Sequence, residues 1–305
     1  MKLTVALLTY NRPNYLKAAI EAIINQTFTD FEFLILDNGS TIETSNVIHS
    51  FEDPRIKYIR NEVNSREFGN FPFGNSKGEY LIITHDDDEM EETFLQREVE
   101  VLDSNLEVGI VATCLSFIDK EGRIFEKNPS RKRKDLVFKK HEFIKSYLYN
   151  GNFLPCPTVM MRLSVINENR IKYNLEVGPM SDLYFLFNFN LLNHSIYLIK
   201  DPLYRYRRHD KQDGVVNRIE MEAKVIPHIK EMLSFSEICN FALKYEQSAI
   251  SQSLAFYIDK FVSRQISLSE LNKIIREFYS TGLRLNRYSI YWGIRAVLRG
   301  LFKRR

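Results

Sequence analysis

The sequence predicts an α/β fold: a mostly parallel sheet flanked by helices, with a helical C-terminal appendage. Two patterns support this prediction. Short apolar runs alternate with amphipathic segments in the first part of the chain, and long segments with helical spacing follow residue 216. The chain has 305 residues, of which 44% are hydrophobic and 27% charged, as in globular proteins. We expect a sheet domain over residues 1–214 and a helical region over residues 215–305.

The elements of the sheet domain follow one another regularly. Residues 2–8 are mostly apolar and alternate poorly, which is typical of a central parallel strand. Residues 14–26 carry apolar side chains at helical spacing, and the next strand ends in the turn Asp37–Ser40. This βαβαβ order predicts right-handed crossovers. The expected strands are residues 2–8, 31–36, 56–60, 80–84 and 108–117, and the expected helices are residues 14–26, 43–51 and 94–102.

A histidine and four acids directly follow the strand-like run Tyr80–Thr84. Clustered carboxylates beside a sheet are costly unless a cation neutralises them. Carboxylate oxygens suit a hard divalent ion such as Mg2+ or Mn2+. The alternative is a solvated acidic turn that begins the next helix, because acids are favourable at a helix N-terminus. The cluster consists of His85, Asp86, Asp87, Asp88 and Glu89.

Three candidate sites fall at the carboxyl ends of predicted parallel strands. Tyr10 follows the first strand, Asp37 follows the second, and the acidic cluster follows Thr84. Ligands of such sheets bind outside the carboxyl ends of the strands. We therefore expect these residues to meet in space.

Composition and charge exclude several other classes of protein. The three scattered cysteines form no CxxC pair, which favours a reducing compartment and argues against a thiolate zinc site. We expect no cleavable signal in the short apolar N-terminus and no spanning helix, and hence a cytoplasmic protein. The net charge is +3, but no acid follows Glu277. Because the positive charge is concentrated at this end, we expect no nucleic-acid partner.

Several motifs together resemble the family 2 glycosyltransferases, which have the GT-A fold. They are LLTYNRP, then Asn25-Gln26-Thr27 before a strand, then LILDNGST, and then GEYLIITHDDDE after an Asn- and Gly-containing stretch. Their order and spacing cover about residues 1–120, and later segments resemble the family over about residues 150–210. The resemblance implies a nucleotide-sugar donor, usually a UDP-sugar, bound together with a divalent metal.

The resemblance also assigns residues to the nucleotide. Thr9 and Tyr10 would line the base pocket, and Asp37 would accept a hydrogen bond from the N3–H group of uracil. The alternative for Asp37 is ordinary Asx-turn chemistry. Arg66 lies in the middle of the polar connection that the family uses to contact the diphosphate and sugar. It would pair with a phosphate, unless it is an exposed loop arginine.

In the metal motif of the family, D-x-D, the alignment from the strand places His85 at the first position and Asp87 at the second. We therefore expect Asp87 to be the main metal ligand. Asp88 would support it, His85 would lie beside the metal or a phosphate, and Asp86 would lie near the ribose or diphosphate.

Two later residues complete the implied site. Asp182 stands where the family places its catalytic base, although Ser181 replaces the more frequent Glu before it. The alternative is an acid in the first turn of a helix. His209 belongs to a segment that resembles the terminal Y-R-x-H motif of the family, and it would lie near the metal and the diphosphate.

The expected reaction is the inverting transfer of a sugar to a hydroxyl of a glycan or a lipid-linked acceptor, as in bacterial envelope synthesis. The amphipathic segment Tyr288–Lys303 has one apolar and one basic stripe, so it either contacts the inner face of the membrane or packs on the catalytic domain. One rival is a sugar nucleotidyltransferase, but the turn after the first strand lacks the glycines that such enzymes need. The other rival is a non-catalytic nucleotide-sugar-binding or scaffold protein.

Overall fold

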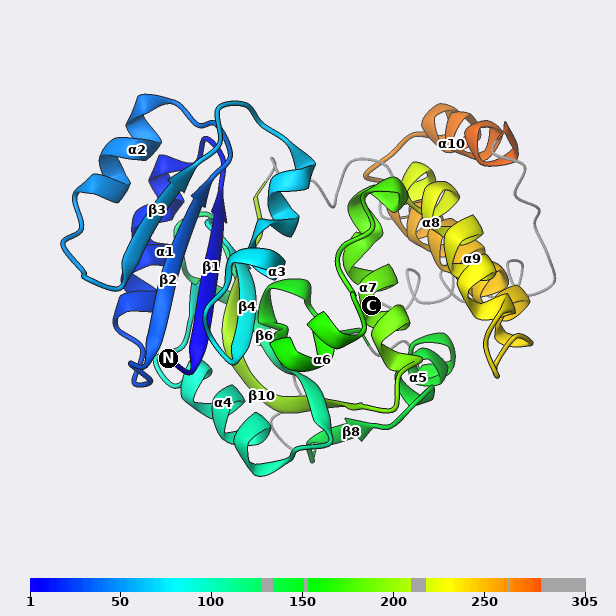
Figure 1. Cartoon of the computed structure of the whole chain (residues 1–305). Coiled ribbons are helices and arrows are strands. Elements are labelled where there is room, and N and C mark those ends of the chain that lie inside the picture. Colours follow the sequence, from blue (N-terminus) through cyan, green and yellow to red (C-terminus); the bar gives the residue numbers. More distant parts are fainter. Residues whose placement is uncertain (128–133, 151–152, 210–217, 263, 281–305) are drawn as a thin grey trace. The chain divides into compact units, whose positions relative to one another are not determined.

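The computed structural model describes residues 1–127, 134–150, 153–209, 218–262 and 264–280 (Figure 1). These residues form two compact units. Unit 1 comprises residues 1–147, 151–173 and 189–211, and unit 2 comprises residues 148–150, 174–188 and the described part of 212–305. Residues 174–188, which precede the boundary predicted at residue 214, thus belong to unit 2. The basic amphipathic segment Tyr288–Lys303 lies outside the described residues.

Unit 1 is built on one sheet, and Figure 1 shows β3, β2, β1 and β4 side by side. The order of the main strands is β3-β2-β1-β4-β9-β6-β10-β5, while β7 pairs with β6 and β8 pairs with β10. The strands are β1 (Leu3–Thr9), β2 (Phe31–Asp37), β3 (Ile56–Arg60), β4 (Tyr80–His85), β5 (Glu89–Met90), β6 (Val108–Ile118), β7 (Ile124–Lys127), β8 (Leu136–Phe138), β9 (Met160–Arg162) and β10 (Ser195–Arg207).

The parallel pairing predicted from the sequence is confirmed. β1 runs parallel to both β2 and β4, β2 runs parallel to β3, and β6 runs parallel to β10. Thr9 pairs with Asp37, and Leu8 pairs with His85. The carboxyl ends of β1, β2 and β4 therefore lie at one edge of the sheet, as the parallel order predicted from the sequence requires.

Four short strands, β5, β7, β8 and β9, were not expected from the sequence, and β9 lies in the interior of the sheet. β9 is three residues long and lies between β4 and β6, antiparallel to both. Its residues are fully or almost fully buried, and Arg162 at its end donates to the carbonyl oxygen of Leu102 at 2.7 Å. This short strand joins the β1–β4 half of the sheet to the β6–β10 half.

Alternating side chains on the strands face the helices that cover the sheet. Leu3, Val5 and Leu7 of β1 are completely buried and belong to one apolar core. Both α1 and α4 contribute their apolar faces to this core. The helices of unit 1 are α1 (Pro13–Ile24), α2 (Ile42–His49), η1 (Arg66–Asn70), α3 (Phe71–Asn75), α4 (Phe94–Ser104), η3 (Cys156–Thr158) and α6 (Leu163–Glu168).

Unit 2 is helical. Its core includes an edge-to-face contact between the rings of Phe187 and Tyr245, whose centroids are 5.6 Å apart. Val225, Ile226 and Ile229 of α8 are buried as well. The remaining helices are α5 (Glu142–Asn150) and α7 (Ser181–Asn190), each of which contributes residues to both units, and η4 (Leu175–Met180), α8 (Arg218–Ser234), α9 (Phe241–Val262) and α10 (Leu268–Ser280) of unit 2.

Candidate active site

The turn between β1 and α1 is shaped by Asn11 and Pro13. Asn11 adopts a left-handed backbone with φ of 53°, a conformation that asparagine tolerates better than most residues. Pro13 occupies the first turn of α1, where its missing N–H costs nothing. The Asn11 N–H donates to Ser40 Oγ at 3.0 Å, and the Thr41 N–H donates to Asn11 Oδ1 at 2.8 Å. These bonds fasten the turn after β1 to the turn after β2.

Asp86 anchors the same turn to the end of β4. It is 1% exposed, and its Oδ2 accepts from Thr9 Oγ1 at 2.7 Å and from the Tyr10 N–H at 3.2 Å. Arg12 Nη1 donates to its Oδ1 at 3.0 Å. Both oxygens of Asp86 thus have partners within the protein, while the side chain of Tyr10 is 42% exposed.

Asp37 is held in a similar way at the end of β2. It is completely buried, its Oδ1 accepts from the Ser40 N–H at 2.8 Å, and its Oδ2 accepts from the Tyr58 hydroxyl at 2.7 Å. The first bond is the turn chemistry that the sequence offered as the alternative. Because each carboxylate oxygen has two lone pairs, these bonds leave acceptor capacity for a base. The role in uracil binding stays a prediction.

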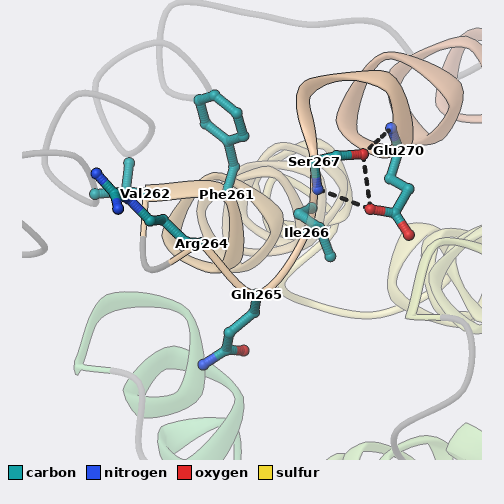
Figure 2. A pocket seen from close by; sticks show the side chains of 7 residues that line it. All are labelled: Phe261, Val262, Arg264, Gln265, Ile266, Ser267 and Glu270. Atoms are coloured by element: carbon teal, nitrogen blue, oxygen red, sulfur yellow. Dashed lines mark hydrogen bonds between the residues drawn. The ribbon is translucent and has the colours of Figure 1, made fainter.

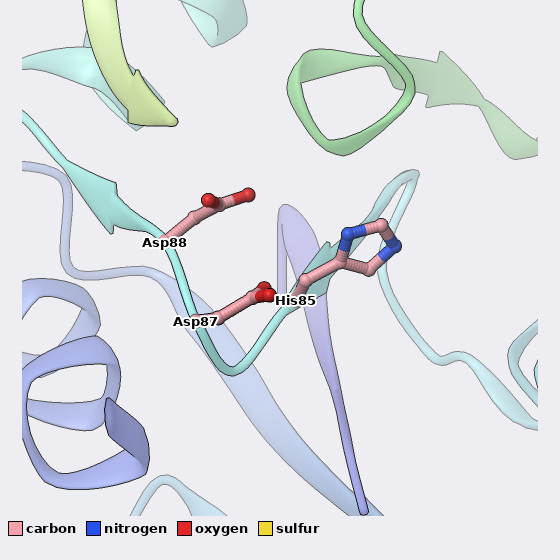
Figure 3. A group of neighbouring side chains, drawn as sticks. All are labelled: His85, Asp87 and Asp88. Carbon is pink, nitrogen blue, oxygen red and sulfur yellow. The ribbon is translucent and has the colours of Figure 1, made fainter. Parts of the chain in front are cut away.

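The three metal donors predicted in the cluster do lie together. Among the residues that the structure describes, His85, Asp87 and Asp88 each offer a donor atom, and these atoms all lie within 4.8 Å of one another. Figure 3 shows the two carboxylates and the imidazole on one turn at the end of β4. One nitrogen and two carboxylate donors suit Mg2+ or Mn2+, so the chemistry of the donor set fits a divalent metal.

His209, predicted near the metal, reaches Asp87. Its Nε2 lies 2.9 Å from Oδ2 of Asp87, and Arg12 Nη1 lies 3.4 Å from the same oxygen. Asp88 accepts from the Tyr204 hydroxyl at 3.2 Å and from the Arg207 N–H at 2.8 Å. The turn that carries Asp87 and Asp88 therefore contacts the turn after β1 on one side and the end of β10 on the other.

The three aspartates differ in their readiness to ionise. Burial raises the pKa of Asp86, against the opposing effects of Thr9 and Arg12. Burial and then the charge of Asp87 raise the pKa of Asp88 well above its ordinary value. Burial also opposes ionisation of Asp87, but the nearby positive groups outweigh it, so the pKa of Asp87 is lowered. Of the three aspartates, Asp87 is thus the one that most readily carries charge.

Arg66 is exposed at the start of η1, on a loop that Asn38 secures. The Asn38 amide donates to Asn64 Oδ1 at 2.7 Å and to the Ser65 carbonyl oxygen at 3.0 Å. Gly39 has a φ of 85°, and a Cβ there would lie 3.0 Å from the backbone of this loop. The loop is therefore held close to the end of β2, and the phosphate role of Arg66 stays a prediction.

Asp182 lies in the first turn of α7, in unit 2. Its Oδ1 accepts from the Leu183 N–H at 2.7 Å, and the residue is half-buried. This position is the first-turn acid that the sequence analysis gave as the alternative. The catalytic role therefore stays a prediction.

Sequence reasoning missed two arginines that bind the cluster. Arg12 pairs with Asp86 and Asp87, and the buried Arg207 contacts the backbone of the turn. Their partners lie 74 or more residues away in sequence, so spacing gives no signal for either pair. The available signal for Arg12 was its place in the turn after the first strand, at the edge where the acids were expected.

A pocket of about 750 Å³ lies elsewhere, at the connection between α9 and α10 of unit 2 (Figure 2). Two of its polar residues, Ser267 and Glu270, form a reciprocal capping box at the start of α10. None of the helices in the described part of the chain is long and apolar enough to cross a membrane.

A sequence-family model identifies the family of this chain. The model described as "Glycosyl transferase family 2" matches residues 4–169, which span β1 to the end of α6. The chain belongs to glycosyl transferase family 2. As a family 2 glycosyltransferase it shares 28% identity with an uncharacterized glycosyltransferase of Methanocaldococcus jannaschii, over 72% of this chain and 74% of the relative.

A second relative of this family 2 chain has a more specific name. It is the GalNAc(5)-diNAcBac-PP-undecaprenol beta-1,3-glucosyltransferase of Campylobacter jejuni. The two sequences are 30% identical over 175 residues, which cover 50% of this chain and 54% of the relative. The match thus spans about half of each protein.

Solved structures confirm the GT-A fold of the family 2 chain. S. aureus TarS 1–349 in complex with UDP-GlcNAc superposes with a TM-score of 0.68 at 16% identity, over 98% of this chain and 89% of the TarS 1–349 chain. The mannosyltransferase PcManGT of Pyrobaculum calidifontis, in complex with GDP-Man and Mn2+, gives a TM-score of 0.57 at 15% identity. That alignment covers 100% of this chain and 88% of PcManGT.

Proposed function

We propose that this family 2 glycosyltransferase is a metal-dependent, inverting enzyme that transfers a sugar from a UDP-sugar to a hydroxyl of a glycan or a lipid-linked acceptor. The observation that carries the proposal is the common edge of β1, β2 and β4. There the turn with Thr9 and Tyr10, the end of β2 with Asp37, and the donor group of the acidic turn lie at neighbouring strand ends.

The donor would bind along this edge of the sheet. Tyr10, with its exposed ring, and Asp37 would contact the base, and Arg66 would pair with the diphosphate. His85, Asp87 and Asp88 would hold Mg2+ or Mn2+, which stabilises the negative charge that develops on the leaving diphosphate. Complexes of related folds with UDP-GlcNAc and with GDP-Man and Mn2+ support a nucleotide-sugar donor.

Asp182 would act as the base of the reaction. Its carboxylate takes the proton of the acceptor hydroxyl while that oxygen forms a bond to the anomeric carbon. The bond between the anomeric carbon and the diphosphate oxygen breaks, and its electron pair leaves with UDP. One displacement from the far side inverts the stereochemistry and needs no covalent intermediate on the protein.

The acceptor would be a glycan of the bacterial envelope, built in the cytoplasm on a lipid carrier. The name of the Campylobacter jejuni relative, which specifies a PP-undecaprenol acceptor, supports a lipid-linked acceptor. The basic amphipathic segment Tyr288–Lys303, outside the described residues, would contact the inner face of the membrane.

A thermal-shift panel tests this proposal and its rival, a non-catalytic scaffold. UDP, GDP, TDP and CMP would each be added with and without Mn2+. A ligand at about a hundred times its Kd stabilises the folded state by about 2.7 kcal/mol. We expect a Mn2+-dependent rise in Tm with UDP alone. A rise with GDP alone would reassign the donor, and no rise with any nucleotide would favour the scaffold.

A further inference from the structure

Arg207, the last residue of β10, is 3% exposed, which is rare for an arginine. We propose that Arg207 is a positioning residue for the divalent metal, because it fixes the turn that carries Asp87 and Asp88. The inference rests on the proposed function in one respect, namely that this turn binds a divalent cation. Arg207 itself would not touch the metal.

Two hydrogen bonds join Arg207 directly to the turn. Its Nε donates to the carbonyl oxygen of Asp87 at 2.8 Å, and its backbone N–H donates to Oδ1 of Asp88 at 2.8 Å. One residue therefore holds the backbone of one predicted ligand and the carboxylate of the next. Together the two bonds limit how far the backbone of Asp87 and the carboxylate of Asp88 can move apart.

The guanidinium is itself held from several directions. Its Nη2 forms an ion pair with Glu89, and its Nη1 donates to the carbonyl oxygen of Asp119 at 2.9 Å. Its Cζ lies 4.9 Å from the centroid of the Tyr15 ring. Since Asp119 belongs to the turn between β6 and β7, the arginine spans the distance between that turn and the metal turn. A planar fork with five N–H donors can make these contacts together, and a lysine ammonium cannot.

Arg205 provides a natural comparison two residues earlier on β10. It also pairs with Glu89, at 3.5 Å, but its main partner is Glu91, which it contacts through Nε at 2.8 Å and Nη2 at 2.9 Å. Its side chain is 34% exposed, against 4% for that of Arg207. No contact from Arg205 to Asp87 or Asp88 is found within the described chain. The two arginines thus share a strand and an ion-pair partner, and Arg207 alone reaches the metal turn.

The test is Mn2+ affinity of the full-length protein, measured by electron paramagnetic resonance of free Mn2+ without any substrate. We compare the wild type with Arg207→Lys and Arg205→Lys, which both keep the positive charge. Groups that orient metal ligands typically change metal affinity by about 10- to 100-fold. We expect Arg207→Lys to raise the Kd for Mn2+ by at least about 10-fold and Arg205→Lys to change it less than about 2-fold.

A second, charge-matched pair covers the case in which Arg207→Lys does not fold. Glu89→Gln and Glu91→Gln each remove one negative charge from the same stretch, but only Glu89 contacts Arg207. We expect Glu89→Gln to weaken Mn2+ binding more than Glu91→Gln does. Equal Mn2+ affinities within both pairs would overturn the positioning role alone. Absence of Mn2+ binding by the wild type would overturn the metal dependence, and the positioning role with it.

Discussion

The hydroxyl of Thr9 donates a hydrogen bond of 2.7 Å to the buried carboxylate of Asp86, so the ends of β1 and β4 are joined by side chains as well as by backbone pairing. With the contacts from Tyr10 and Arg12, this bond makes Asp86 an anchor for the turn after β1. Asp87, the next residue, does not serve as such an anchor. Its carboxylate lies beside His85, Asp88 and His209, the side chains that would surround a metal. We therefore expect these adjacent aspartates of one motif to have separable roles.

Replacing Asp86 by Asn should mainly reduce stability. The new NH2 group would oppose one of its present donors, either the Arg12 Nη1 at 3.0 Å or the pair formed by Thr9 and Tyr10. An unsatisfied buried group costs about 1–3 kcal/mol, so Tm should fall by several degrees. Differential scanning calorimetry would measure the change, and an unaltered Tm would argue against the anchoring role.

Replacing Asp87 by Ala should remove Mn2+-dependent UDP binding while the chain stays folded. The pKa of Asp87 is lowered, so the variant loses the most readily ionised donor of the group. The measurement is the thermal shift with UDP, with and without Mn2+, and Glu100→Gln, an exposed change on α4, serves as the control. If Asp87→Ala kept the Mn2+-dependent shift, the main ligand would have to be Asp88 or Asp86.

Replacing Asp182 by Asn should leave nucleotide binding intact and slow the transfer of sugar. The amide keeps the shape of the side chain, and its oxygen can still accept from the Leu183 N–H, but it cannot take a proton. Loss of a general base costs about 10²- to 10⁴-fold in rate. Turnover and the UDP-induced shift would be measured together. Unchanged turnover would exclude Asp182 as the base.

Replacing Glu98 by Gln should alter the pH dependence of stability. Glu98 of α4 is completely buried, and both of its carboxyl oxygens lack a hydrogen-bond partner within the described chain. Burial raises its pKa well above the ordinary value. Because the folded state holds this proton more tightly than the unfolded state, the stabilising effect is complete below the unfolded pKa and is lost as pH rises through the folded pKa.

The wild type should therefore lose stability as pH rises, whereas the glutamine of Glu98→Gln does not titrate. The Tm of Glu98→Gln minus the Tm of the wild type should increase from about pH 5 to about pH 8. Melting both proteins across this range would test the expectation. Glu100→Gln, an exposed change on the same helix, is the control. A Tm difference independent of pH would show that Glu98 does not titrate with folding in this range.

Deleting the chain after Asn286 should release the protein from anionic vesicles. The deletion removes six of the seven basic residues that follow Glu277, together with the apolar stripe of the predicted interfacial segment. Co-sedimentation with vesicles of about 30% anionic lipid would be compared for the intact and shortened chains, since each basic residue adds about 1 kcal/mol near such a surface. If the intact protein stays in the supernatant, the membrane proposal fails.

The fold, and the edge of the sheet where the site residues gather, could be predicted from the sequence because both follow from patterns of neighbouring residues. The buried strands β1, β2 and β4 are mostly apolar runs, and their parallel order places Thr9, Asp37 and the acidic turn at one edge. These features need no knowledge of distant contacts. The three predicted donors, His85, Asp87 and Asp88, are close in sequence, so their proximity also followed from it.

Features that depend on distant partners were not predictable in the same way. β9 is too short to show a periodic pattern, and the sheet that buries it is formed by strands on both sides. Arg207 is one of several basic residues near the end of β10, and its burial depends on Glu89, 118 residues earlier. The position of Glu98 was likewise not predictable. A charged residue is expected on the exposed face of α4, but Glu98 is completely buried.

The position of β9 in the sheet has a consequence for synthesis of the chain. Once β4 has paired with β1 in the growing chain, its other edge can gain its partner only after Met160–Arg162 has been made. About 75 residues separate the two strands, which at about 5–20 residues per second leaves that edge open for roughly 4–15 seconds. An unpaired apolar edge is a template for association with other chains. We therefore expect nascent chains that end before residue 160 to need chaperone protection, and slow translation between β4 and β9 to lower the yield of folded protein.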